Sequence, residues 1–448
     1  MRTALQAAIA IAFAAVGACA HYPATPGLLE YAPSVGYRFA NTPPTSANSD
    51  SLMVILTFSG GGTRAAALST GVLRELDRTA VPGEPGRTLL DEVDIISSVS
   101  GGSFTAAYFA LHGREGLDRF ETEFLDWNAQ AALKRDLLAP MRIIRLLSRN
   151  YSRIDHAAAT WDQRLFGDAT FGDLIGRRPL IIINAADMSL GATFSFTQEQ
   201  FDPLCANLAD FPLSRAVAAS SAFPGLLSPL TLENHGDDCG FEAPGWVENA
   251  LEDADIGGDR YRLARHLLTY RDTDVRPFVH LLDGGLADNI GLRPILRSLT
   301  STSGDWSVLR MINNGQVRRV VVIVVNAKTD TRSNVDLREQ PPGIKRVLQT
   351  VVSTPLGNYS RESVQRLREV SDDFLRELTA TPSTALPEVH FHAIEVSFDG
   401  LDDVEERRYF ETLPTSFRLP PDVVDQLTEV GGRLLREAEE FQALLAQF

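Results

Sequence analysis

Strand-like runs rich in apolar residues recur along the chain and alternate with segments of helical spacing. The runs cover residues 52–58, 93–99, 180–184, 279–282, 319–326 and 390–396. The run at 52–58 is continuous, as is typical of a strand buried on both faces in a parallel sheet. Helical patterns follow two of them directly, at residues 65–76 and 104–110. The alternation predicts an α/β fold with a mostly parallel central sheet.

Two further regions depart from this alternation. Residues 231–275 are rich in Asp, Gly and Asn, and we expect a long insertion with one short helix at 261–269. Segments of this length are often lids or binding elements, with disorder as the alternative. Near the C-terminus, one apolar stripe runs from Val364 to Leu378 and another from Val424 to Leu445. Both predict amphipathic helices, and we expect residues 331–448 to form an extension packed on the domain that begins at residue 51.

The N-terminus has the pattern of an export signal. Arg2 precedes an apolar run from Ala4 to Ala18, which is too short to span a bilayer comfortably and ends in small residues. Val16-Gly17-Ala18-Cys19 is similar to a bacterial lipobox, in which cleavage falls before the cysteine and that cysteine is lipidated. An ordinary signal peptide is the alternative. We therefore expect a signal peptide at 1–18 and a lipidated, proline-rich tether at 19–50.

The expected location follows from the residue after the cysteine. Ala20, rather than an aspartate, follows Cys19, and by resemblance to the sorting rule of Gram-negative lipoproteins this predicts an exported outer-membrane lipoprotein. It would face the periplasm or the cell surface. Apart from Cys19 the chain has only Cys205 and Cys239, which we expect to pair in an oxidising compartment, two separate thiols being the alternative.

Composition narrows the classes of partner. The hydrophobic fraction of 44% and the charged fraction of 22% are typical of a globular protein with a large core. The formal charge of −16 argues against nucleic acid as a partner, because binding to phosphate backbones needs a basic surface. It also argues against binding anionic lipid by bulk charge.

The first chemical signal is the segment Ser98-Val99-Ser100-Gly101-Gly102. It lies between the strand at 93–99 and the helix at 104–110. A serine on a tight strand-to-helix turn, followed by glycines, is the pattern of a nucleophile elbow. The helix that follows directs its free N–H groups toward the place where an oxyanion would form. Ser100 is therefore a candidate nucleophile for acyl transfer.

Two more segments fit the same chemistry. Ser59-Gly60-Gly61-Gly62-Thr63-Arg64 follows the first strand, and its glycines can bring backbone N–H donors close to an oxyanion. A nucleotide phosphate loop is the weaker alternative, because no Gly-Lys-Ser/Thr follows. Asp283-Gly284-Gly285 follows another strand, and Asp283 can accept the serine proton as a general base. A turn-capping role for Asp283, or Asp288 or Asn289 as the base, remains open.

These segments, with the Ala/Ser-rich helix ending in Phe223-Pro224, occur in the order found in the patatin-like phospholipase family. The resemblance covers roughly residues 51–292. It implies a three-layer αβα fold and a Ser–Asp dyad that cleaves acyl esters of phospholipids or lysophospholipids, without a metal or other cofactor. By position it makes Ser100 the nucleophile and Asp283 the base. The remaining site residues carried over are Gly60, Gly61 and Gly62 as the oxyanion hole, with Arg64, Gly102, Gly284 and Gly285 in support.

One residue departs from the family pattern. Its elbow is usually Gly-x-Ser-x-Gly, and Ser98 stands at the first glycine, on the crowded side of the turn. Two other functions therefore remain in view: a non-catalytic lipid-binding lipoprotein on a decayed hydrolase fold, and a Ser-His-Asp esterase. The esterase would need a histidine after the acid, for which His390 and His392 are candidates.

Overall fold

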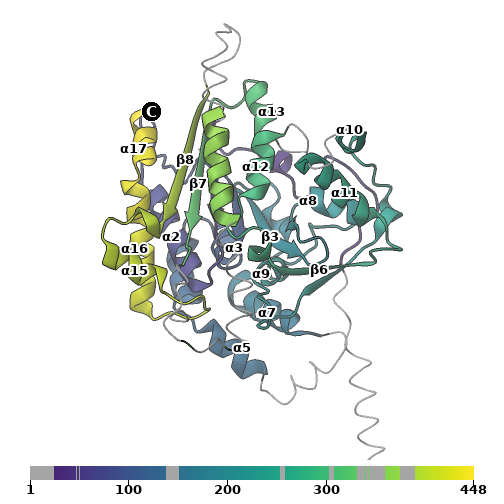
Figure 1. The fold of residues 1–448 in the computed structure, drawn as a ribbon, viewed down its shortest axis with the longest axis horizontal. Helices are drawn as coiled ribbons and strands as arrows, with labels where there is room; N and C mark the ends of the chain where they lie inside the picture. Colours follow the sequence, from purple (N-terminus) through teal and green to yellow (C-terminus); the bar gives the residue numbers. More distant parts are fainter. Residues whose placement is uncertain are drawn as a thin grey trace, which may run out of the picture.

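The fold of the 448-residue chain is seen in a computed structural model (Figure 1). The structure describes residues 25–46, 48, 49, 51–137, 151–252, 258–301, 307–329, 339, 343, 359–373 and 389–448. The expected signal peptide and Cys19 lie outside these residues, and so does the apolar stripe beyond residue 373.

One mixed sheet forms the centre of the described residues, with eight strands in the order β5-β6-β3-β2-β1-β7-β8 and β4 paired with β3. The strands are β1 (Leu52–Phe58), β2 (Val93–Val99), β3 (Leu180–Asp187), β4 (Thr193–Ser195), β5 (Leu230–Glu233), β6 (Phe278–Asp283), β7 (Arg319–Asn326) and β8 (His390–Ser397). The run β3-β2-β1-β7-β8 is parallel, whereas β4, β5 and β6 pair antiparallel. The predicted α/β fold with a mostly parallel sheet is confirmed.

Helices cover both faces of the sheet. Ser97 and Ser98 are consecutive in β2, so their side chains point to opposite faces. The Ser98 hydroxyl lies 3.1 Å from that of Ser103 in α3 (Gly101–His112), while the Ser97 hydroxyl donates to the carbonyl of Gly291, just before α12 (Arg293–Thr300). The sheet therefore lies between an α3 layer and an α12 layer.

The other α-helices surround this frame. They are α2 (Thr63–Arg78), α4 (Gly116–Phe120), α5 (Ala129–Leu137), α7 (Arg153–Trp161), α8 (Gln198–Phe201), α9 (Leu213–Ser220), α10 (Gly245–Glu252), α11 (Asp259–Arg271), α13 (Val308–Asn313), α15 (Val404–Glu411), α16 (Pro421–Glu437) and α17 (Glu439–Ala446), and residues 359–373 are helical as well. The single stripe expected from Val424 to Leu445 is divided into α16 and α17, because Ala438 adopts an extended conformation with ψ 127°. Apolar spacing alone continues through such a break.

The C-terminal extension is part of the central layers. Its strand β8 pairs with β7 over eight residues, and α16 lies against α2 (Figure 1). The two helices approach at glycines: a Cβ on Gly71 would lie 2.0 Å from the Thr428 carbonyl oxygen, and one on Gly431 would lie 2.5 Å from the Leu68 carbonyl oxygen. Backbone contact of this kind leaves no room for a side chain.

The second half of the expected tether is packed against the domain. Tyr37 is fully buried and its hydroxyl bonds the backbone of Ile181 in β3, while Arg38 forms a buried ion pair of 2.6 Å with Asp202. The prolines of residues 25–49 led us to expect a free linker, but the segment also carries side chains that bury well. The described residues of the expected tether therefore pack on the domain, and its link to a lipid anchor stays a prediction.

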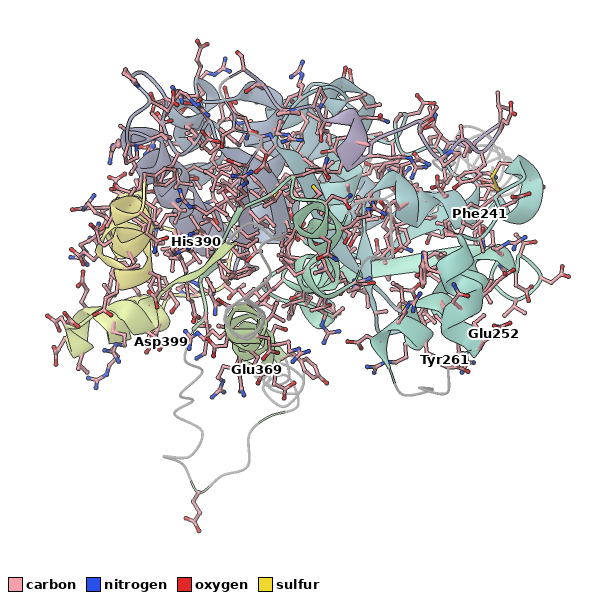
Figure 2. All side chains as sticks on the ribbon, turned by 90° about the horizontal axis from the view of Figure 1, so that it is seen from above. Phe241, Glu252, Tyr261, Glu369, His390 and Asp399 are labelled. Atoms are coloured by element: carbon pink, nitrogen blue, oxygen red, sulfur yellow. A yellow bond between two sulfur atoms is a disulfide. The ribbon has the colours of Figure 1, made fainter. Side chains whose placement is uncertain are left out.

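The insertion at 231–275 has more regular structure than expected. Its first residues belong to β5, and it carries two helices, α10 and α11, instead of one. Figure 2 shows Phe241, Glu252 and Tyr261 from this region at one end of the molecule, with His390 and Asp399 at the other. Tyr270 and Arg276 both bond the Asp187 carboxylate at the end of β3, at 2.8 and 2.6 Å.

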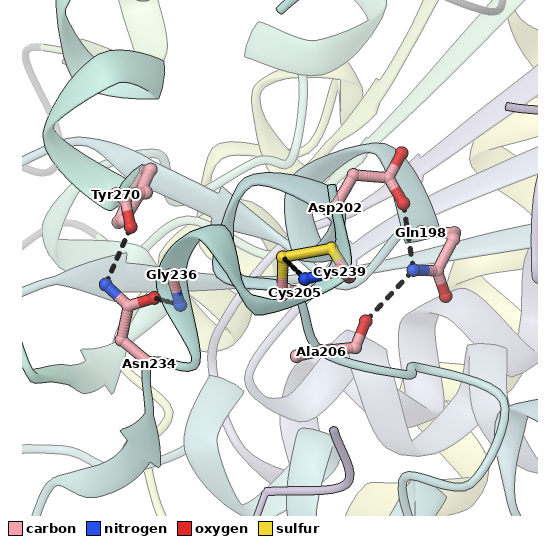
Figure 3. The surroundings of a disulfide bond; sticks show 8 residues. All are labelled: Gln198, Asp202, Cys205, Ala206, Asn234, Gly236, Cys239 and Tyr270. Atoms are coloured by element: carbon pink, nitrogen blue, oxygen red, sulfur yellow. Dashed lines mark hydrogen bonds between the residues drawn. A yellow bond between two sulfur atoms is a disulfide. The ribbon is translucent and has the colours of Figure 1, made fainter. Parts of the chain in front are cut away.

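A disulfide closes this region. Cys205 and Cys239 are joined (Figure 3). The N-terminal segment lies along the bond: Leu28 N–H donates to the Cys205 carbonyl and Tyr31 N–H to the Cys239 carbonyl. Among the described residues, none of the helices combines the length and the hydropathy needed to cross a membrane.

We predict that Gly71→Ala destabilises the fold by about 1–3 kcal/mol or more, because the added methyl group meets backbone atoms of α16 that cannot turn aside. Urea unfolding would measure the change. Gly245→Ala is the matched control, since a Cβ there has nothing within 4 Å, and it should stay within about 0.5 kcal/mol of the parent. Equal unfolding midpoints for the two variants would contradict the close α2–α16 contact.

Candidate active site

Ser100 stands on a sharp turn between β2 and α3. It has φ 49° and ψ −117°, a backbone conformation that few residues other than glycine adopt. The glycines beside it permit close backbone contacts: a Cβ on Gly101 would lie 2.1 Å from the Gly62 carbonyl oxygen, and one on Gly102 would lie 2.6 Å from the Phe58 Cβ. The turn therefore has the geometry expected of a nucleophile elbow.

Asp283 meets Ser100 across 183 residues of sequence. The Ser100 hydroxyl donates to Asp283 Oδ2 at 3.2 Å, and the Gly285 N–H donates to Asp283 Oδ1 at 2.9 Å. Both side chains belong to residues only 7% exposed. Burial raises the pKa of Asp283 to about 7, although the hydrogen bonds from Gly285 and Ser100 act in the opposite direction.

The glycines after Asp283 allow neighbouring segments to approach the backbone closely at the dyad. A Cβ on Gly284 would lie 2.2 Å from the Asn184 carbonyl oxygen in β3. A Cβ on Gly285 would lie 2.9 Å from Asn289 Oδ1, and one on Gly60 would lie 2.7 Å from the same atom. The Asn289 amide thus occupies the space between the glycine-rich loop and the segment that follows Asp283.

The glycine-rich loop has fewer free donors than expected. The Gly60 N–H donates to the Asn289 carbonyl at 2.8 Å, so it is not available to an oxyanion. Gly61 and Gly62 have φ 143° and 62°, and within the described part of the chain their N–H groups have no hydrogen-bond acceptor. Of the three predicted donors, the N–H groups of Gly61 and Gly62 therefore remain available. The carbonyl that engages Gly60 comes from Asn289, more than 200 residues away in sequence.

Arg64 holds the loop in place. Its guanidinium donates to the Ala327 carbonyl at 3.0 Å, to the Leu413 carbonyl at 2.6 Å and to the Thr415 hydroxyl at 3.1 Å. The side chain is buried, and this burial lowers its pKa to about 10. Because its donors are engaged by the protein, Arg64 acts as a support and is not placed to bind a phosphate.

Asp288 and the two candidate histidines make other contacts, whereas the Asn289 amide lies beside the glycine-rich loop. Asp288 accepts the N–H of Arg293 at 2.7 Å and that of Ile290 at 3.3 Å, so its carboxylate caps the start of α12. His390 and His392 lie in β8, and β7 and β1 separate that strand from β2. His392 is instead 3.1 Å from Gln447 Oε1. A Ser-His-Asp set is therefore absent from the described site.

Ser98 fits the elbow without distortion of the strand. It is fully buried, and β2 keeps its parallel register with β3 at this residue. Its hydroxyl lies 3.1 Å from the Ser103 hydroxyl and 3.4 Å from the Ile182 carbonyl oxygen. The serine in the family's glycine position thus finds polar partners on the α3 face.

Two partly exposed apolar side chains lie in the loop that contacts Asp283. Phe223 and Leu226, in the loop after α9, are each 37% exposed, and the neighbouring Ala222 carbonyl accepts the Asp283 N–H at 3.1 Å. A cavity of about 820 Å³ lies elsewhere, between α8, α11 and α12, and neither Ser100 nor Asp283 lines it. No cluster of three or more metal-ligating side chains occurs among the described residues.

Sequence reasoning did not single out the residue that bonds the backbone of the nucleophile. Ser220, at the end of α9, accepts the Ser100 N–H at 2.8 Å. The small residues of this helix indicated only close packing. A serine within the Ala-rich second half of this helix was the one available signal, because a buried hydroxyl needs a partner.

Comparison with known proteins assigns the chain to a family. The family model described as patatin-like phospholipase matches residues 56–296, more than half of the chain and all four motifs. The chain therefore belongs to the patatin-like phospholipase family, as its motifs predict. A search of curated proteins finds no match to the sequence.

Solved structures show only remote similarity. Human GIVD cytosolic phospholipase A2 aligns with a TM-score of 0.44 and 13% identity over 88% of this chain and 62% of that one. Its complex with methyl gamma-linolenyl fluorophosphonate gives 0.39 and 12%, over 89% and 59%. VipD from Legionella pneumophila gives 0.31 and 10%, over 94% and 70%. The chain thus spans less than two thirds of the human enzyme.

Proposed function

We propose that the protein is a serine acyl-ester hydrolase of membrane lipids, of the phospholipase A or lysophospholipase type. Ser100 is the nucleophile and Asp283 the general base. The observation that carries the proposal is the 3.2 Å contact between the Ser100 hydroxyl and the buried Asp283 carboxylate, at the start of a helix and beside a glycine-rich loop. Membership of the patatin-like phospholipase family supports the lipid substrate.

The first half of the reaction forms an acyl-enzyme. Ser100 Oγ attacks the acyl carbonyl carbon while its proton passes to Asp283 Oδ2. The N–H groups of Gly61 and Gly62 and the N-terminal end of α3 stabilise the oxyanion. When the tetrahedral intermediate collapses, the bond to the alcohol oxygen breaks, and that oxygen takes the proton from Asp283.

The second half releases the acyl chain. A water molecule attacks the acyl-enzyme and gives a proton to Asp283, and the same donors hold the second oxyanion. Collapse then frees the fatty acid, and Ser100 Oγ recovers the proton from Asp283. The raised pKa of Asp283 suits this shuttle, because a carboxylate with a pKa near 4 would be a poor acceptor for a serine proton.

The N-terminal anchor is a second part of the proposal. We infer that Cys19 is lipidated, which would keep the enzyme at an outer-membrane surface facing the periplasm or the exterior. The packing of the chain from Thr25 onward leaves few residues between the anchor and the fold. Six extended residues span at most about 20 Å, so the lipid would hold the domain close to the bilayer.

We predict that a fluorophosphonate probe labels the wild-type protein and that Ser100→Ala abolishes labelling. Asp283→Asn should lower the labelling rate by about 10²–10⁴-fold, the usual range for loss of a general base. Ser189→Ala, an exposed serine, and Asp288→Asn, a buried carboxylate that caps a helix, are the matched controls and should keep most of the activity. A folded wild-type protein that does not label would instead favour the non-catalytic lipid-binding lipoprotein.

The pH dependence gives a separate prediction. The base must be ionised to accept a proton, so kcat/KM for a lysophospholipid should fall about tenfold for each pH unit below an apparent pKa of about 7. The residual rate of Asp283→Asn should lack this acid limb. An acid limb near pH 4 that persists in Asp283→Asn would rule out Asp283 as the base.

For the anchor, we expect Cys19→Ser to move the protein from the membrane fraction to the soluble fraction and to abolish incorporation of labelled palmitate. Ala20→Asp should keep the label but shift the protein toward the inner membrane. Equal membrane association of the wild type and Cys19→Ser would contradict lipidation at this residue.

A further inference from the structure

The end of α9 contacts both members of the dyad. The Ser220 hydroxyl accepts the N–H of Ser100 at 2.8 Å, and the carbonyl of Ala222 accepts the N–H of Asp283 at 3.1 Å. In both contacts the donor is a backbone N–H, and the two donors come from different strands: Ser100 follows β2 and Asp283 ends β6. A single short segment therefore sets the spacing of the nucleophile and the base.

The Ser220 hydroxyl is itself fixed on two further sides. It donates to the Asn184 carbonyl in β3 at 2.6 Å and lies 3.0 Å from the Ser103 hydroxyl in α3. A hydroxyl has one proton, and Ser220 gives it to Asn184, so Ser220 can only accept in the contact with Ser103, whose own proton is shared between Ser98 and Ser220. Ser220 and Ser103 are both fully buried. A different rotamer of Ser220 would lose at least one of its three hydrogen-bond partners, which are the Ser100 N–H, the Asn184 carbonyl and the Ser103 hydroxyl.

The nucleophile has a specific need for this acceptor. Ser100 is held at a positive φ, which costs a non-glycine residue free energy that the surrounding contacts must offset. Its N–H is buried, so loss of the acceptor would leave an unsatisfied donor in the elbow. The same hydrogen bond fixes the plane of the Val99–Ser100 peptide, and that plane determines the direction in which the Ser100 side chain leaves the backbone.

Ser98 belongs to the same cluster. Its hydroxyl lies 3.1 Å from that of Ser103, so hydroxyls run in sequence from Ser98 through Ser103 to Ser220 on the inner side of the elbow. The hydroxyl of Ser98 accounts for a serine where the family pattern has glycine, because it contacts the Ser103 hydroxyl and not an apolar side chain. The cluster lies behind the nucleophile, on the α3 face of the sheet.

We propose that Ser220 is a positioning residue for Ser100. Its hydroxyl holds the N–H of the nucleophile and so directs Ser100 Oγ toward Asp283, and Ser103 and Ser98 complete the polar support. The inference rests on the proposed function, since it assigns a role to Ser220 only through the nucleophile that it supports. Ser220 itself does not contact the substrate.

The test compares three variants of the full-length protein. Ser220→Ala should lower kcat for a lysophospholipid by about 10–100-fold, because a small misplacement of a reacting group costs this much, while KM changes by less than about twofold. The rate of fluorophosphonate labelling should fall by the same factor. Ser220→Thr retains the hydroxyl and should restore most of both rates.

Ser221→Ala is the matched control. Ser221 is the neighbouring buried serine, and its hydroxyl bonds only carbonyls of its own helix, Val217 at 2.8 Å and Ala218 at 3.3 Å. Its kcat and labelling rate should stay within about twofold of the wild type, even if both alanine variants lose similar thermal stability. This comparison separates positioning from general support of α9.

Two outcomes would overturn the inference. Ser220→Ala with wild-type kcat and labelling rate would show that the hydroxyl only satisfies packing needs. Absence of labelling in the wild-type protein would overturn the proposed function, and this inference with it. If Ser220→Ala does not fold, Ser220→Cys gives the same test, because a thiol has a similar shape but is a weak acceptor.

Discussion

The rest of the structure depends on one contact, between the Ser100 hydroxyl and the buried carboxylate of Asp283. Among the described residues, no cationic side chain pairs with this carboxylate. A buried charge is costly, so Asp283 can be held there only by N–H and O–H donors that are themselves fixed. Three backbone segments therefore converge to within contact distance. The glycines at 62, 101 and 284 lie where these backbones meet, and any side chain there would force the segments apart.

The site also depends on residues far outside the family-matched region. Residues 413–416 accept hydrogen bonds from Arg64 and from the Thr63 N–H, and so hold the glycine-rich loop against the elbow. This segment lies between α15 and α16, and α16 packs against α2, the helix that follows the glycine-rich loop. The C-terminal extension is therefore part of the catalytic framework, and the glycine contacts between α2 and α16 link the stability of the fold to the geometry of the loop.

Much of this arrangement could be predicted from the sequence. Strands β1, β2 and β7 have the predicted bounds, because their apolar runs end at glycine or polar residues, and Ser100 and Asp283 were expected to meet. Other features depend on tertiary contacts that leave no local signal. The Gly60 N–H is engaged by Asn289, the helix after Val424 breaks at Ala438, and the proline-rich residues 25–49 pack through Tyr37 and Arg38. Composition could not distinguish that segment from a free linker, because the outcome depends on which of its side chains and backbone groups find partners in the fold.

The N-terminal segment bears on how mechanical load would enter the fold. Hydrogen bonds join it, in order along the chain, to Glu233, Asn207 and the carbonyls of Cys205 and Cys239. A force applied at the N-terminal end of the described chain would therefore act first on the loop closed by the Cys205–Cys239 disulfide. Only then would it reach Tyr37 and strand β3. The disulfide thus lies between the N-terminal end of the described chain and the Ser100–Asp283 pair, where it would resist a force before that force altered their spacing.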